Sequence, residues 1–171
     1  MMTPDIYDKY AVSDYEKVIK EVYEKYERKL HMNNSVDFDD LLLLPIQLFK
    51  KNPDVLDKYQ ELYQYILIDE YQDTNEAQYI LTKLLSAKNR KITCVGDDSQ
   101  SIYSFRGANY KNILNFETDY KDAKTILLEE NYRSTSTILD AANQVIKNNK
   151  QRKIFIRQQY CFMGCFRKLR N

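Results

Sequence analysis

Three short apolar runs recur in the chain after residue 64, and each is followed at once by polar residues. The runs cover residues 65–68, 92–95 and 125–128. Runs of this length are typical of strands buried in a parallel sheet. Helical spacing predicts helices over residues 75–87 and 109–118, and Ser134 is the expected N-cap of a further helix. The alternation predicts an α/β fold with a parallel sheet flanked by helices.

The region before the first run has a helical pattern. Residues 13–31 have apolar side chains at helical spacing, and Ser13 is the expected N-cap. We expect the apolar face of this helix to pack in the core. Asp37 should cap a second helix, which bends or restarts at Pro45, and a short third helix should start at Asn52-Pro53-Asp54 and run to about Tyr63. The apolar face of the first helix consists of Tyr15, Val18, Ile19, Val22, Tyr23, Tyr26 and Leu30.

The fractions of hydrophobic and charged residues favour a globular domain over a membrane protein. Of the 171 residues, 43% are hydrophobic and 30% are charged, which favours one domain with a core. No apolar stretch approaches the ~20 residues of a membrane span, and the N-terminus lacks the pattern of a signal peptide. We therefore expect a cytoplasmic protein without a membrane partner. The formal net charge is +1, so overall charge does not favour nucleic-acid binding.

The end of the chain differs in composition from the rest. Residues 150–171 contain seven Lys and Arg and no Asp or Glu. Two explanations remain open for residues 154–171. One is a changed reading frame, vector-derived sequence or an early stop, and the other is a basic tail that contacts nucleic acid.

The first polar cluster places two acids directly after an apolar run. Asp69 and Glu70 follow Ile66-Leu67-Ile68, and loops after the carboxyl ends of parallel strands are where open α/β sheets bind ligands. One acid can hold Mg²⁺, and its neighbour can accept a proton from a water that attacks a phosphate. The alternative is a strand end followed by the acidic start of a solvated helix.

The second cluster, residues 96–108, combines an amide with aromatic and cationic side chains. Gly96 permits a tight exit from the strand, and Gln100 has the donors and acceptor needed to sense a terminal phosphate. Tyr103, Phe105 and Arg106 are suited to stacking on single-stranded bases and holding the backbone. The alternative is a buried aromatic turn.

The third cluster is Asn131-Tyr132-Arg133-Ser134. Tyr132 could stack on a nucleobase, and Arg133 could reach a phosphate. The only glycines are Gly96, Gly107 and Gly164, and none precedes a Lys. A phosphate-cradling loop of the G-x-x-x-x-G-K-[ST] kind is therefore absent from this sequence.

Together and in this order, the three clusters resemble superfamily 1 DNA helicases of the UvrD, PcrA and Rep type. The match runs from about residue 5 to 153, and Asp37-Phe38-Asp39-Asp40-Leu41 is also similar to a stretch before motif II. The motifs, in chain order, are Asp-Glu-Tyr-Gln-Asp-Thr-Asn (motif II), Val-Gly-Asp-Asp-Ser-Gln-Ser-Ile-Tyr-Ser-Phe-Arg-Gly-Ala (motif III) and Leu-Glu-Glu-Asn-Tyr-Arg-Ser (motif IV).

The resemblance implies a role for each site residue. Asp69 would hold Mg²⁺, Glu70 would be the base for hydrolytic water, and Gln100 would sense the γ-phosphate. Tyr103, Phe105 and Arg106 would contact single-stranded DNA, with Phe105 in place of the usual Trp. Tyr132 would stack on adenine and Arg133 would reach the γ-phosphate.

The resemblance also implies a domain organisation. Residues 1–35 would end the helical 1B subdomain, 36–120 would form the C-terminal half of the RecA-like P-loop NTPase motor domain 1A, and 121–153 would begin motor domain 2A. Residues 154–171 do not match the family. We therefore expect an internal fragment of an ATP-dependent 3′-to-5′ DNA helicase.

Alone, this fragment should bind ATP and Mg²⁺ weakly and should not hydrolyse ATP. It could self-associate through surface exposed by truncation. The alternatives are a non-catalytic module that binds DNA or protein, and the helicase subunit of a helicase–nuclease complex.

Overall fold

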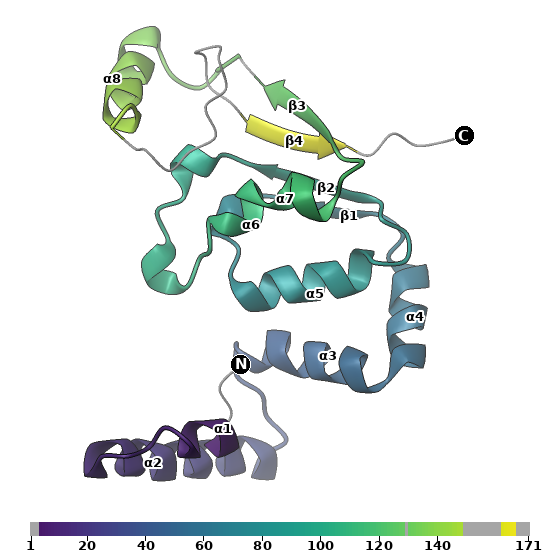
Figure 1. Ribbon diagram of the computed structural model, residues 1–171, viewed down its shortest axis with the longest axis vertical. Coiled ribbons are helices and arrows are strands. Elements are labelled where there is room, and N and C mark those ends of the chain that lie inside the picture. The colour runs from purple at the N-terminus through teal and green to yellow at the C-terminus, as the bar shows by residue number, and fades with distance from the viewer. Residues whose placement is uncertain (1–3, 129, 149–161, 167–171) are drawn as a thin grey trace. The chain divides into compact units, whose positions relative to one another are not determined.

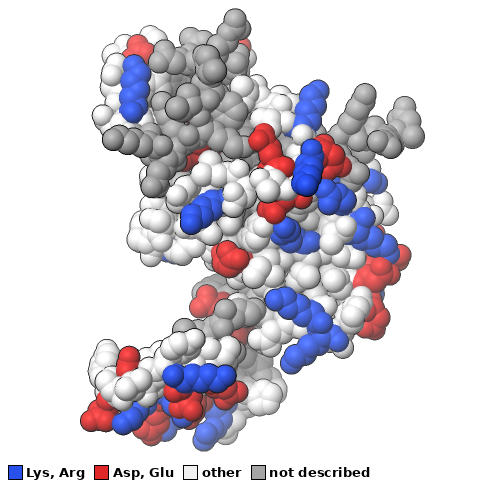
Figure 2. All heavy atoms as spheres, viewed as in Figure 1, with Lys and Arg blue, Asp and Glu red and all other residues white. Residues whose placement is uncertain are grey.

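A computed structural model describes residues 4–128 and 130–148, and the backbone of 162–166. The chain divides into two compact units, Met1–Pro53 and Asp54–Asn171. Within the described residues, no helix is sufficiently long and apolar to cross a membrane. On the face shown in Figure 2, the described basic and acidic side chains are interspersed and not gathered by sign.

The first unit contains α1 (Pro4–Asp8), α2 (Asp14–Met32) and α3 (Asp40–Lys51) (Figure 1). The predicted cap of α2 is confirmed, because the Ser13 hydroxyl accepts the N–H of Glu16 and the Glu16 carboxylate accepts the N–H of Ser13. The prediction that the apolar face of α2 packs in a core is wrong. No residue of α2 is buried, and Tyr15 is 75% exposed, because this unit does not provide a covering surface for that face.

The predicted cap of the next helix is shifted. α3 begins at Asp40, with Asp39 and not Asp37 at the N-cap position, and continues through Pro45. Asp37 lies before the helix, where its carboxylate accepts the N–H of Asp40 at 3.0 Å and the Asp40 carboxylate accepts the N–H of Asp37 at 3.2 Å. This reciprocal pair satisfies two backbone donors at the helix start.

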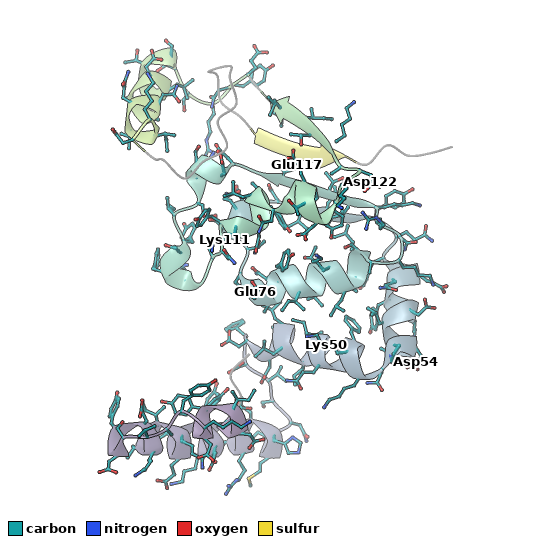
Figure 3. All side chains as sticks on the ribbon, in the orientation of Figure 1. Lys50, Asp54, Glu76, Lys111, Glu117 and Asp122 are labelled. Carbon is teal, nitrogen blue, oxygen red and sulfur yellow. The ribbon has the colours of Figure 1, made fainter. Side chains whose placement is uncertain are left out.

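Up to residue 146, and apart from the helix predicted over residues 109–118, which is two short helices, the helices and strands of the second unit follow the predicted order. They are α4 (Pro53–Leu62), β1 (Ile66–Ile68), α5 (Glu76–Ser86), β2 (Ile92–Gly96), α6 (Lys111–Leu114), α7 (Phe116–Asp119), β3 (Lys124–Leu128), α8 (Ser136–Ile146) and β4 (Phe162–Phe166). Figure 3 labels Glu76 at the start of α5 and Lys111 at the start of α6. The predicted N-cap of the last helix moves by one residue, from Ser134 to Thr135.

The sheet is mixed and not wholly parallel, which corrects the predicted architecture. Its strand order is β1-β2-β4-β3. β1 pairs with β2 in parallel, with Ile66 opposite Ile92. β4 pairs antiparallel with both β2 and β3, so β3 still runs in the same direction as β1 and β2. β4 comes from the C-terminal tail, where no strand was predicted.

The core lies between β2 and the helices that follow it. Tyr71, Ile92, Cys94, Ile113, Phe116 and Tyr120 form one buried cluster. The Tyr71 and Phe116 rings meet edge to face with centroids 5.6 Å apart, an arrangement that stabilises beyond the area buried. β1 was predicted to be buried, but Leu67 is 77% exposed, because β1 is the sheet's edge strand and one of its faces is uncovered.

Candidate functional site

The acidic turn after β1 has an uncommon backbone conformation. Glu70 has φ 50° and ψ 43°, in the left-handed region that residues with a Cβ seldom adopt. The Asp69 carboxylate accepts the N–H of Glu70 at 2.9 Å, and both side chains are exposed. The turn therefore presents two adjacent carboxylates to solvent at the carboxyl end of a strand, where a ligand can reach them.

A buried amide joins this turn to the loop after β2. Gln72 is only 1% exposed. Its Nε2 donates to Oε2 of Glu70 at 2.7 Å, and its Oε1 accepts the N–H of Asp97 at 3.0 Å. The Gln72 backbone carbonyl also accepts the hydroxyl of Ser101 at 3.2 Å. Gln72 therefore connects the first two predicted clusters through two hydrogen bonds, and a third holds Glu70 within the first cluster.

Gly96 is required by this close approach. A Cβ at Gly96 would lie 2.6 Å from Oε1 of Gln72 and 3.1 Å from the backbone nitrogen of Tyr71. Any larger residue would therefore have to displace the Gln72 amide or the backbone of the turn. The role expected from the sequence was a tight exit from the strand, but Gly96 is the last residue of β2 and does not have a positive φ.

Gln100 lies beside Asp97 in the loop after β2. Asp97 Oδ1 accepts the N–H of Ser99, and Oδ2 accepts Nε2 of Gln100, both at 2.9 Å. Burial raises the pKa of Asp97, and the hydrogen bond from Gln100 partly opposes that rise. Gln100 is exposed, so one end of its amide is held by the protein while the side chain faces solvent.

The aromatic and cationic side chains of the second cluster lie on the surface. Tyr103 is 40% exposed and Phe105 is 76% exposed, with their ring centroids 5.9 Å apart. The Arg106 guanidinium carbon lies 5.6 Å from each ring centroid. The alternative of a buried aromatic turn is therefore wrong, since these side chains form an exposed group that a flat ligand could contact.

The hydrogen bonds that the described residues make around the third cluster lie within its own loop. Asn131 Oδ1 accepts the N–H groups of Arg133 and Ser134, both at 2.9 Å. Tyr132 is 86% exposed, and its hydroxyl donates to Glu130 at 2.7 Å, which raises the tyrosine's pKa. Among the described residues, the hydrogen bonds around Gln72 do not extend to Tyr132 or Arg133.

The acidic turn fits one part of a magnesium site. The described residues contain no group of three His, Cys, Asp or Glu side chains that could hold a metal ion. Mg²⁺ at phosphate-transfer sites is commonly bound by one or two carboxylates, with phosphates and waters as the other ligands. An exposed carboxylate such as Asp69 can therefore supply one of the ligands of such a site.

Asp73 adds a further carboxylate at this turn. Its Oδ1 is buried and has no hydrogen-bond partner among the described residues. Burial raises the pKa of Asp73, and the nearby Glu70 carboxylate raises it further. Its Oδ2 lies 3.5 Å from Nε2 of Gln72, so the Gln72 amide faces two carboxylates.

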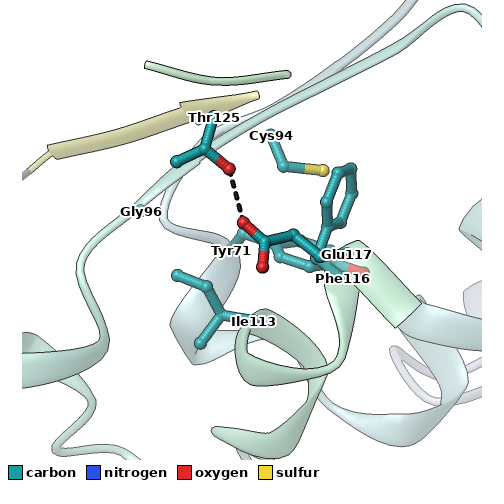
Figure 4. A pocket seen from close by; sticks show the side chains of 7 residues that line it. All are labelled: Tyr71, Cys94, Gly96, Ile113, Phe116, Glu117 and Thr125. Carbon is teal, nitrogen blue, oxygen red and sulfur yellow. Dashed lines mark hydrogen bonds between the residues drawn. The ribbon is translucent and has the colours of Figure 1, made fainter. Parts of the chain in front are cut away.

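A small hollow lies next to Gly96, on the core side of the sheet (Figure 4). Its empty volume is about 280 Å³, which includes space open to solvent. Tyr71, Ile113 and Phe116 contribute apolar walls, and the Thr125 hydroxyl donates to Glu117 at 2.6 Å across it. Gly96 and Tyr71 line this hollow, but the residues predicted to contact nucleotide, metal or DNA do not.

The geometry defines an α/β protein with a polar site built from the loops after two neighbouring parallel strands. Comparison with known proteins then gives the family. The UvrD/REP helicase N-terminal domain family matches residues 2–121, and the chain belongs to this family.

Three relatives show the extent of the similarity. The chain is 53% identical to the ATP-dependent DNA helicase PcrA of Staphylococcus aureus over 153 residues, which are 90% of this chain and 21% of that protein. It is 52% identical to the PcrA of Staphylococcus epidermidis, with the same coverage. It is 51% identical to the PcrA of Leuconostoc citreum over 152 residues, 89% of this chain and 20% of that protein. The chain thus spans about a fifth of the length of these relatives.

Proposed function

We propose that this chain forms part of an ATP-dependent helicase that moves 3′-to-5′ along single-stranded DNA. The observation that supports this most directly is the Gln72 amide, which holds Glu70 and the loop of Gln100 at one sheet edge. A site that hydrolyses a nucleotide needs a base for water and a group that senses the terminal phosphate, at neighbouring positions. Membership of the UvrD/REP helicase family and the similarity to the ATP-dependent DNA helicase PcrA support such an activity.

The residues that follow β1 and β2 have separate roles in this proposal. Asp69 would hold Mg²⁺, which when bound supplies positive charge that offsets the charge of the phosphates. Glu70 would accept the proton of the attacking water, because its carboxylate is exposed and oriented by Gln72. Gln100 would contact the γ-phosphate with its exposed amide. The presence or absence of this phosphate would then change the loop that carries Tyr103.

The third cluster would complete the nucleotide site from motor domain 2A. Tyr132 would stack on adenine, and Arg133 would stabilise charge on the γ-phosphate. The high exposure of Tyr132 agrees with a role in contacting a ligand. This proposal keeps the domain boundaries expected from the sequence, with 1B ending near residue 35 and 2A beginning near residue 121.

Single-stranded DNA would bind at the exposed aromatic group. Tyr103 and Phe105 would stack on bases, and Arg106 would hold a phosphate beside them. The exposure of these side chains and the distances between them support this assignment.

The chain alone should not hydrolyse ATP, since its sequence lacks a phosphate-cradling loop. The test is a chimera in which the matched segment of the Staphylococcus aureus PcrA is replaced by that of this chain. We expect DNA-dependent ATP hydrolysis in the chimera, a loss of at least about 100-fold in Glu70→Gln, and no turnover by the isolated chain. A folded but inactive chimera, or turnover by the isolated chain that Glu70→Gln abolishes, would overturn the proposal.

The second candidate function is a non-catalytic DNA-binding module, which the exposed Tyr103, Phe105 and Arg106 group favours. Fluorescence anisotropy of the isolated chain with a single-stranded oligonucleotide, over a range of salt concentrations, separates the two. Micromolar binding that weakens with salt and is lost in Tyr103→Ala would favour the module. The matched control is Tyr63→Ala, an exposed tyrosine of the same unit outside this group.

A further inference from the structure

We propose that Gln72 is a positioning residue that sets the orientation of the Glu70 carboxylate and makes it depend on the loop of residues 97–101. This inference rests on the proposed function, because it concerns the base of that same site. None of the sequence patterns assigned Gln72 a role.

The orientation of the Gln72 amide is fixed by its partners. The N–H of Asp97 can only donate, so the atom that faces it at 3.0 Å must be the carbonyl oxygen Oε1. The carboxylate of Glu70 accepts, so the atom that faces it at 2.7 Å is Nε2. A flipped amide would set donor against donor and acceptor against acceptor, so only one orientation satisfies both contacts.

A second buried glutamine shows why this arrangement is more than structural. Gln60 is 7% exposed, and its Nε2 donates to the backbone carbonyl of Leu84 at 2.6 Å. Its partner is therefore a backbone carbonyl at the end of α5. The Nε2 of Gln72 instead donates to the carboxylate of Glu70, which is exposed to solvent. The stability of the core does not require this carboxylate to have one fixed orientation.

Glu70 and the 97–101 loop are coupled because both bond the same planar side-chain amide of Gln72. If a ligand at Gln100 shifts the 97–101 loop, the N–H of Asp97 moves with it and the Gln72 amide must follow. Gly96 leaves Gln72 little space to relax in another direction, because a Cβ there would already lie 2.6 Å from Oε1. The Glu70 carboxylate would therefore turn when the 97–101 loop moves. Glu70 would then have the orientation needed to act as the base in only one position of that loop.

Nuclear magnetic resonance of the complete chain tests this arrangement without requiring activity. In the wild type we expect the Gln72 side-chain NH₂ resonances to be shifted and to exchange slowly with solvent, unlike those of the exposed Gln78. Glu70→Gln should move the Gln72 NH₂ resonances. Gln72→Met removes both the acceptor for Asp97 and the donor for Glu70, so the Asp97 backbone N–H should be less protected than in the wild type.

Gln60→Met is the matched control, since it removes a buried glutamine amide elsewhere and should leave the Glu70 and Asp97 signals in place. The inference is overturned if the Gln72 NH₂ resonances are unchanged in Glu70→Gln, or if Gln60→Met and Gln72→Met have the same effect on Asp97.

Kinetics in the chimera test the link to catalysis. Gln72→Met should lower kcat by about 10-fold or more, while KM for ATP changes by less than about threefold, since the base is misplaced and the nucleotide ligands remain. Equal losses in Gln72→Met and Gln60→Met would reject the positioning role. An inactive wild-type chimera would reject the proposed function, and the resonance data would still decide whether Gln72 holds Glu70.

Discussion

The loops that follow β1 and β2 differ from the loop that follows β3 in how they are held. In the first two, Gln72 is buried and bonds both Glu70 and Asp97, and Asn112 donates from α6 to Thr74. In the third, the hydrogen bonds that Asn131 and Tyr132 make with other described residues stay within the loop. Similar polar clusters after strands can thus be joined to each other by hydrogen bonds from buried amides, or be held by hydrogen bonds within their own turns. The first arrangement fixes side chains before a ligand arrives, and the second leaves them to be fixed by what they bind.

The largest expected effect is on the contact between β2 and the acidic turn. Gly96→Ala should lower the free energy of unfolding by about 2–3 kcal/mol, because its Cβ would press on Gln72, on Ile113 and on the backbone of Tyr71. Urea unfolding followed by circular dichroism measures this change. Gly107→Ala is the control: its φ is 85° with nothing within 4 Å of a Cβ, so only backbone strain of about 1 kcal/mol is expected. An equal or larger loss in Gly107→Ala would contradict the close approach at Gly96.

Removing a buried amide should cost more than removing a half-buried one in a surface turn. Asn112 is 4% exposed and donates to both Oγ1 and the carbonyl of Thr74 at 3.1 Å. Asn112→Ala should lower the free energy of unfolding by about 1–3 kcal/mol, since buried partners lose their donor. Asn131→Ala removes an Asx turn at the surface and should cost less than about 1 kcal/mol. Comparable losses in the two variants would remove the distinction between the loops.

The pH dependence of stability should report Asp97. Burial raises its folded-state pKa above that of the unfolded chain, so the folded protein holds this proton more tightly. The free energy of unfolding should therefore fall as the pH rises above about 4, through the range between the two pKa values. Asp97→Asn should reduce this fall, and Asp54→Asn provides the matched substitution at an exposed acid. Unfolding curves from about pH 3.5 to 7 measure both slopes, and a slope in Asp97→Asn that equals the wild type would count against the raised pKa.

The smallest effect on stability is expected in the third loop. Tyr132 is 86% exposed, so Tyr132→Ala should change the free energy of unfolding by less than about 0.5 kcal/mol. In the chimera, the same variant should raise KM for ATP by about fivefold or more through loss of stacking. A large loss of stability would show that this loop is built into the fold in the way that the first two are.

Much of the local structure could be predicted from the sequence. The order of helices and strands in the second unit, the start of α2 after Ser13 and the helix starting after Asn75 all follow from apolar spacing and capping residues. The positions of Asp69 and Gln100 after their strands follow in the same way. These features depend on near neighbours in the chain, so a single sequence carries enough information for them.

Other features depended on partners that are distant in the chain. The apolar pattern of α2 indicated a buried face, but spacing does not say whether a covering surface is present, and Tyr15 and Val22 are exposed. In the same way, the apolar run of β1 did not reveal that Leu67 lies on an uncovered face of an edge strand. The antiparallel strand β4 was missed because strand pairing joins residues far apart in sequence.

The sequence by itself determined the family, the order of elements and the identity of the exposed side chains that could carry chemistry. Only the tertiary structure showed that Gln72 is the link between two of the clusters and that Gly96 is small because Gln72 lies against it. The physical reason is that packing in three dimensions decides which side chains meet where the loops after neighbouring strands lie side by side. A glutamine two residues after Glu70 has no local signal that distinguishes a buried bridge from an exposed turn residue.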